Sequence, residues 1–139
     1  MTVLLDTNII MDALQERSPF DAAAKKILLY GQNGKIKCVF TANAMSDIFY
    51  LYSKVRSRKE AKIALGFLLN TYGVVPVTQN ECSRALALPN DDFEDALVEV
   101  CAKGVGADYI VSRDSEFKAI ATEVKVITPD ELLEMLKIS

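Results

Sequence analysis

Two aspartates in this 139-residue chain come directly after, or close behind, short apolar segments. Asp6 follows the apolar residues 2–5, and Asp114 follows a second such run at residues 109–112. In parallel α/β sheets the functional groups gather beyond the carboxyl ends of the strands, so we expect these two carboxylates to lie at one edge of a sheet. Asp108 precedes its run, so we expect it at the opposite edge and outside any shared site.

Two further aspartates fall on predicted helices, beside apolar residues. Asp95 directly precedes Ala96 in a stripe of apolar residues at helical spacing, and it forms a like-charge i,i+4 pair with Glu99. Asp47 has a similar position on the inner side of an earlier predicted helix. A carboxylate at the border of a core needs a partner, and no adjacent lysine or arginine supplies one. Taken singly, Asp47 could accept a local hydrogen bond instead, and Asp6 could cap a following helix.

Together, the four carboxylates suit a hard divalent cation such as Mg²⁺ or Mn²⁺, which prefers oxygen ligands. The chain contains no histidine, which excludes Ser-His triads, Cys-His dyads and His-rich zinc sites. A water nucleophile would therefore need activation by a metal. Residues 22–62 carry nine basic and two acidic side chains, although the net charge of the chain is −3. A carboxylate cluster facing a basic lobe is the arrangement that a phosphodiesterase needs.

The elements that must position these acids alternate along the chain. Short apolar runs between longer amphipathic stretches predict βαβ units around a parallel sheet. The expected strands are residues 2–5, 36–40, 74–77, 109–112 and 124–127. The expected helices begin at Ser18–Pro19, cover residues 44–52, 61–72, 80–88 and 91–103, and end with one that begins at Thr128–Pro129. We expect one α/β domain over residues 1–139, with three α/β/α layers and a central parallel sheet of about five strands.

The amino-acid composition indicates what class of protein this domain belongs to. The chain is 50% hydrophobic and 25% charged, as is usual for globular proteins. Its longest apolar run is about seven residues, against the roughly 20 that a membrane-spanning helix needs, so we expect no membrane segment. The three scattered cysteines predict no disulfide framework, and we expect a cytoplasmic protein with reduced thiols. Four tyrosines near apolar stripes are expected to pack and not to stack on bases: Tyr30, Tyr50, Tyr52 and Tyr72.

Three segments together resemble the PIN domain family, the nuclease fold found in VapC-type toxins of toxin–antitoxin pairs. They are VLLDTN at residues 3–8, FEDAL at 93–97 and ADYIVSRDSEF at 107–117, in matching order and spacing over essentially the whole chain. By position, Asp6, Asp95 and Asp114 match the family's metal-binding aspartates. Asn8 matches the asparagine after the first of them, and Ser112 the hydroxyl residue two before the last. Asp47 stands where the family usually has a glutamate, and it is one methylene shorter.

The resemblance implies an endoribonuclease that uses Mg²⁺ or Mn²⁺ to cleave single-stranded RNA, as the toxin of a toxin–antitoxin pair. Asp6, Asp95 and Asp114 would hold one ion, with Asp47 serving a second ion or an outer-sphere water. Ser112 and Asn8 would orient carboxylates and water by hydrogen bonds. The implied partners are a second copy in a homodimer and a small antitoxin that covers the site. Candidates for contacts to RNA phosphates are Lys54, Arg56, Arg58 and Lys59.

Other interpretations of the same residues stay open. A catalytically silent PIN fold, acting as an RNA-binding or protein-interaction module, is favoured by Asp47 in place of a glutamate and by the acidic net charge. Ser112 could simply cap the end of its strand. A phosphotransfer enzyme fits less well, because haloacid-dehalogenase-type phosphatases need a second aspartate where this chain has Asn8. Metal-stimulated turnover would separate the nuclease from the silent module.

Overall fold

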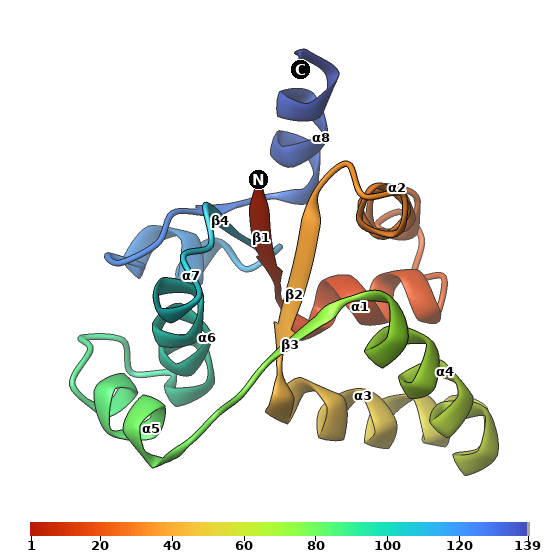
Figure 1. Ribbon diagram of the computed structural model, residues 1–139, viewed down its shortest axis with the longest axis horizontal. Helices are drawn as coiled ribbons and strands as arrows, with labels where there is room; N and C mark the ends of the chain where they lie inside the picture. Colours follow the sequence, from red (N-terminus) through yellow and green to blue (C-terminus); the bar gives the residue numbers. More distant parts are fainter. Residues whose placement is uncertain (139) are drawn as a thin grey trace.

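A parallel five-stranded sheet forms the centre of the computed structural model, which describes residues 1–138 (Figure 1). The strand order is β3-β2-β1-β4-β5, so the chain runs outward on one side of β1 and then crosses to the other. The carboxyl ends of all strands therefore share one edge, and the direction of winding changes between β1 and β4. The strands are β1 (Thr2–Leu5), β2 (Lys37–Thr41), β3 (Gly73–Val75), β4 (Tyr109–Val111) and β5 (Val126–Ile127).

Helices cover both faces of this sheet. Within residues 1–138 there are eight: α1 (Thr7–Leu14), α2 (Asp21–Gln32), α3 (Ala42–Val55), α4 (Arg58–Thr71), α5 (Gln79–Leu86), α6 (Phe93–Gly104), α7 (Ser115–Ile120) and α8 (Pro129–Ile138). Helices α1–α4 and α8 pack on one face, and α5–α7 pack on the other (Figure 1). The predicted α/β/α layers and the parallel sheet of about five strands are confirmed.

Alternation along the strands explains the two separate cores. Val3 and Leu5 of β1 belong to the core beneath α1–α4 and α8, whereas Leu4 between them belongs to the core beneath α5–α7. Leu4 pairs with Val39 of β2 and Ile110 of β4, which point to that same second face. Because successive side chains of a strand point to opposite faces, a strand covered on both sides is apolar throughout. This is why the continuous apolar runs predicted each end of each strand to within two residues.

The helix predicted to begin at Ser18–Pro19 in fact begins later. Its first residue is Asp21, because Phe20 is still part of a turn in which its N–H donates to the carbonyl of Arg17 at 2.9 Å. In contrast, Thr128 caps α8 as expected: its hydroxyl accepts from the Glu131 N–H at 3.1 Å.

The helices of residues 1–138 include none with the length and apolar character needed to cross a membrane.

Candidate active site

Asp6 marks the point where the central strand β1 ends and α1 begins. As the N-cap of α1, its Oδ1 accepts a hydrogen bond from the Thr7 N–H at 2.8 Å. Its Oδ2 accepts a second bond from the Ser112 hydroxyl, also at 2.8 Å, across the boundary to β4. The carboxylate is therefore held at both oxygens and has a fixed orientation.

The turn after β4 carries two more predicted residues. The buried hydroxyl of Ser112 donates to Asp6 and accepts from the Asp114 N–H at 3.1 Å, so it links the ends of the two strands. Asp114 in turn caps α7, since its Oδ1 accepts from the N–H groups of Glu116 and Phe117 at 2.9 and 3.2 Å. Ser112 is thus more than a strand-end cap, because its two bonds set the spacing of two carboxylates.

The third segment of the site is the beginning of α6. Asp92 is its N-cap, and Asp92 Oδ1 accepts from the Asp95 N–H at 3.0 Å. This bond anchors the first helical turn, from which Glu94 and Asp95 project toward Asp6. Neither Asp92 nor Glu94 was among the residues predicted for the site. Both belong to the site, and the density of acids over residues 91–95 was the signal that could have identified them.

These segments surround one cavity of about 360 Å³. The structure brings together all four predicted aspartates and Asn8 along its wall, and Ser112 lies behind Asp6. The lining residues are Asp6, Thr7, Asn8, Asp47, Tyr50, Leu51, Asp92, Glu94, Asp95 and Asp114. None of its six acids forms an ion pair with a lysine or arginine of the described residues.

Burial and mutual repulsion make it energetically unfavourable for all the carboxylates of this cavity to be ionised together. The pKa of Asp95 rises to about 7, first because it is partly desolvated and then because Asp92, Asp6 and Asp114 are negative neighbours. Burial also raises the pKa of Asp6, against the lowering effect of the bonds from Ser112 and Thr7. The pKa of Glu94 is raised by burial and then by the charge of Asp47, which places these two side chains together. A cation in the cavity would relieve this repulsion.

The donor atoms of the cavity fit a hard divalent cation, because they are carboxylate oxygens without a basic partner. However, no group of three or more His, Cys, Asp or Glu side chains in residues 1–138 is positioned so that it could hold a metal ion. The carboxylates surround the cavity without converging on one point. An ion bound there would have to draw them closer together.

On the far side of the Ser112–Asp114 turn lies an ion pair that sequence reasoning missed. Arg113 donates from Nε and Nη2 to both oxygens of the buried Asp12 on α1, at 2.7 and 3.0 Å, and Arg17 lies 3.8 Å from Asp12. This bidentate pair ties α1, which begins at the Asp6 cap, to the turn that carries Ser112 and Asp114.

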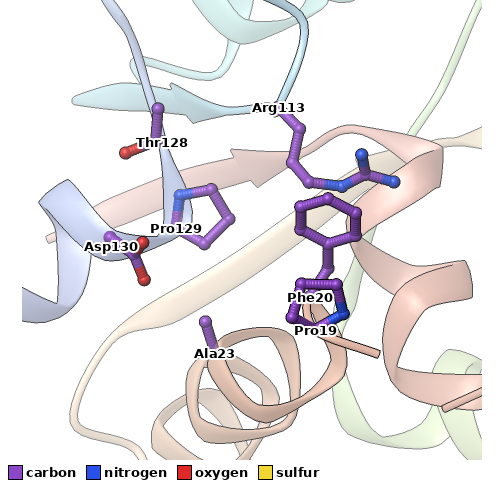
Figure 2. A pocket seen from close by; sticks show the side chains of 7 residues that line it. All are labelled: Pro19, Phe20, Ala23, Arg113, Thr128, Pro129 and Asp130. Carbon is purple, nitrogen blue, oxygen red and sulfur yellow. The ribbon is translucent and has the colours of Figure 1, made fainter. Parts of the chain in front are cut away.

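The Arg113 guanidinium also lies 3.9 Å from the centre of the Phe20 ring. Figure 2 shows this arrangement on one wall of a separate pocket, with Thr128, Pro129 and Asp130 opposite. Arg113 is therefore engaged away from the acidic cavity.

Two other acids are held by backbone amides outside the cavity. Asp108 accepts from the Thr2 N–H at 2.8 Å at the amino-terminal edge of the sheet, as expected. Glu99 is buried and accepts from the N–H groups of Thr122 and Glu123. Asp95 therefore lines the cavity, whereas Glu99, the other member of this like-charge pair, is bound by the loop after α7.

The four predicted RNA-contacting residues lie together at the α3–α4 turn. All are exposed: Lys54, Arg56, Arg58 and Lys59. One turn before the end of α3, Tyr50 is 57% exposed and lines the acidic cavity, so the expectation that it packs in the core is wrong. Tyr72 does pack as expected, donating its hydroxyl to the Leu28 carbonyl at 2.7 Å.

A doubly covered parallel sheet with carboxylates gathered at the β1–β4 boundary defines the class of this protein. The PIN domain family model matches residues 2–116, and the chain belongs to that family.

Among curated proteins, the chain is similar to Ribonuclease VapC1 of Aquifex aeolicus, with 27% identity over 140 residues that cover 95% of this chain and 93% of the relative. Its fold is similar to that of a toxin–antitoxin complex from Klebsiella pneumoniae, with TM-score 0.69, 20% identity, and coverage of 91% and 97% of the two chains. It is also similar to VapC20 of Mycobacterium tuberculosis, described as a sarcin–ricin loop cleaving toxin, with TM-score 0.69, 16% identity, and coverage of 88% and 98%.

Proposed function

We propose that this chain is an endoribonuclease that depends on Mg²⁺ or Mn²⁺ and cleaves single-stranded RNA. The observation that carries the proposal is the gathering of Asp6, Asp95 and Asp114 around one cavity without a basic partner among the described residues. Membership of the PIN family supports it, as do the names of Ribonuclease VapC1 and of the sarcin–ricin loop cleaving toxin to which the chain is similar.

In this proposal each side chain has a distinct task. Asp6, Asp95 and Asp114 hold the ion, and Asp47 binds a second ion or a water beside Glu94. A bound divalent ion would supply Lewis acidity at the phosphate and activate water as the nucleophile. The remaining two predicted residues act by hydrogen bonding. The Ser112 hydroxyl keeps the Asp6 carboxylate oriented, and Asn8 presents an amide to water or substrate at the cavity wall.

We further propose that the protein is the toxin of a toxin–antitoxin pair, which acts on RNA in the cytoplasm. The structural similarity to a chain of a toxin–antitoxin complex supports this role. Its partners would be a second copy in a homodimer and an antitoxin that neutralises the acidic cavity. A basic side chain of the antitoxin, placed among these carboxylates, would relieve the same repulsion as a metal ion.

The alternative is a catalytically silent PIN fold that binds RNA or protein. The absence, in residues 1–138, of three acids already converged on one point favours this second function. It predicts that the cavity neither binds a divalent ion nor supports cleavage.

Calorimetric titration of Mn²⁺ into the wild-type protein and Asp95→Asn tests the proposal. Saturable binding that weakens at least tenfold in Asp95→Asn is expected, followed by Mn²⁺-dependent cleavage of a single-stranded RNA by the wild type alone. Asp130→Asn is the matched control, because Asp130 is also a first-turn helical aspartate but is exposed and does not line the cavity. If no Mn²⁺ binds up to millimolar concentration, with or without RNA, and no RNA is cut, the silent module is the correct interpretation.

A further inference from the structure

Tyr50 is an aromatic side chain without an evident packing role at the wall of the acidic cavity. It is 57% exposed, although burying an aromatic ring is usually favourable. Three other exposed aromatics lie outside the cavity: Phe20, Phe67 and Phe93. Two of these have ring contacts, because Phe20 lies beneath Arg113 and Phe67 meets Tyr72 edge to face at 6.2 Å. Tyr50 is thus distinguished by its place beside the carboxylates.

Lys54 completes a small arrangement around this ring. Its Nζ lies 4.3 Å from the centre of the Tyr50 ring, which is cation–π contact. Lys54 forms no ion pair with an acid of the described residues, so its charge stays available to an anion. The ammonium occupies one face of the ring, and more than half of the Tyr50 surface is still open to solvent.

Helix α3 aligns these groups in an order that matches a nucleotide. Asp47, Tyr50 and Lys54 are spaced i, i+3 and i+7, so they lie along one side of the helix. The seven residue steps from Asp47 to Lys54 correspond to about 10 Å along the helix axis. An acid at the cavity, an aromatic ring and a cation therefore follow one another outward from the carboxylates.

We propose that Tyr50 and Lys54 form a nucleotide subsite of the active site, in which the ring stacks on an unpaired base and the ammonium contacts a neighbouring phosphate. The inference rests on the proposed ribonuclease function and adds a reason for preferring single strands. A base in a duplex has both faces covered by its neighbours, whereas an unpaired base offers a face to an aromatic side chain. Because every base has such a face, this subsite selects unpaired over paired RNA and does not select sequence.

Affinity measurements with two replacements of Tyr50 test the stacking. Anisotropy of a labelled single-stranded oligoribonucleotide is measured in the Asp95→Asn background, so that the RNA is not cut. Tyr50→Phe keeps the ring and is expected to bind within twofold of its parent. Tyr50→Leu is expected to weaken binding about 5- to 150-fold, the range that corresponds to the loss of one base–aromatic stack. Phe67→Leu, on α4 outside the cavity, is the matched control and is expected to leave the affinity unchanged.

A second measurement distinguishes stacking from a structural effect. The chain contains no tryptophan, so Tyr50→Trp introduces a single indole whose fluorescence reports directly on the subsite. Single-stranded RNA is expected to quench this fluorescence, whereas an abasic oligomer of equal length and a fully paired duplex are not. The Tyr50→Leu penalty should likewise vanish on the abasic oligomer.

The inference is overturned if a folded Tyr50→Leu protein binds RNA like its parent, or if it loses the same affinity for normal and abasic oligomers. These results would leave the nuclease proposal intact, provided that the wild type cleaves RNA with Mn²⁺. Conversely, if the wild type does not cleave RNA but the Tyr50→Trp variant shows base-dependent quenching, the nuclease proposal fails and the subsite is retained as part of a silent RNA-binding module.

Discussion

Replacing Asp95 with asparagine should make the metal-free protein more stable at neutral pH. The pKa of Asp95 is about 7 in the folded chain, against an ordinary value of 3.8. The folded state therefore binds this proton more tightly than the unfolded state does, so stability falls as pH rises from about 4 to about 7. At 1.36 kcal/mol per pH unit the difference corresponds to about 4 kcal/mol, which solvent screening of this partly exposed group reduces to about 1–2 kcal/mol.

Asp95→Asn removes the charge, keeps the side-chain size, and leaves the bond from the backbone N–H of residue 95 to Asp92 in place. In EDTA at pH 8, we expect the free energy of unfolding to rise by about 1–2 kcal/mol, which raises the melting temperature by about 3–8 °C. At pH 4 the variant and the wild type should melt together, because Asp95 is then protonated in the folded state.

Thermal unfolding followed by circular dichroism at pH 4, 6 and 8 is the assay. Addition of millimolar Mn²⁺ at pH 8 should reverse the order, because a ligand that binds only the folded state stabilises it, and Asp95→Asn has lost part of the site. Asp130→Asn should follow the wild type in every condition. An Asp95→Asn protein that is no more stable than the wild type in EDTA at pH 8 would show that the charge of Asp95 does not destabilise the folded state.

Three further predictions concern groups that line the cavity or support the segments around it. Ser112→Ala removes both hydroxyl bonds that link the ends of β1 and β4, and it should lower the free energy of urea unfolding by about 2–3 kcal/mol; an unchanged midpoint would contradict this. Arg113→Met leaves Asp12 buried without its bidentate partner and should cost about 3–5 kcal/mol in the same assay, part of which Asp12→Leu should restore in the double variant. Asp47→Asn should lower the pKa of Glu94 toward its ordinary value, as measured by carboxyl carbon NMR titration; an unmoved pKa would show that burial alone raises it.

The strands and the principal acids were predictable because the signals for them lie in short segments of the sequence. A strand buried on both faces is apolar at every position, so β1 and β4 stand out, and the acids just beyond them follow from parallel-sheet geometry. Asp95 was predictable for a similar reason, since it borders an apolar helical stripe without a nearby base. The family resemblance then added Asn8 and Ser112, which no periodicity selects.

The features that the sequence did not predict depend on contacts between segments that are distant in the chain. Asp12 and Arg113 are 101 residues apart, and neither has a sequence neighbour that indicates the other. Glu94 looks like a favourable first-turn acid, and only the fold places it beside Asp47. Tyr50 lies at helical spacing with apolar residues, but the cavity interrupts the packing at that position. The sequence pattern predicts which side chains share one face of a helix, whereas the tertiary structure decides what packs against that face.

The 106-residue separation of Asp6 and Ser112 has a consequence for how the protein is made. Chains fold as they leave the ribosome, amino terminus first, so Asp6 emerges well before its partner Ser112. Ser112, in the turn that follows the partner strand β4, emerges 106 residues later. A chain interrupted before that turn contains no assembled carboxylate site. The carboxylates at the ends of β1 and β4 therefore come together only after the intervening segments, β2 and β3 among them, have been synthesised.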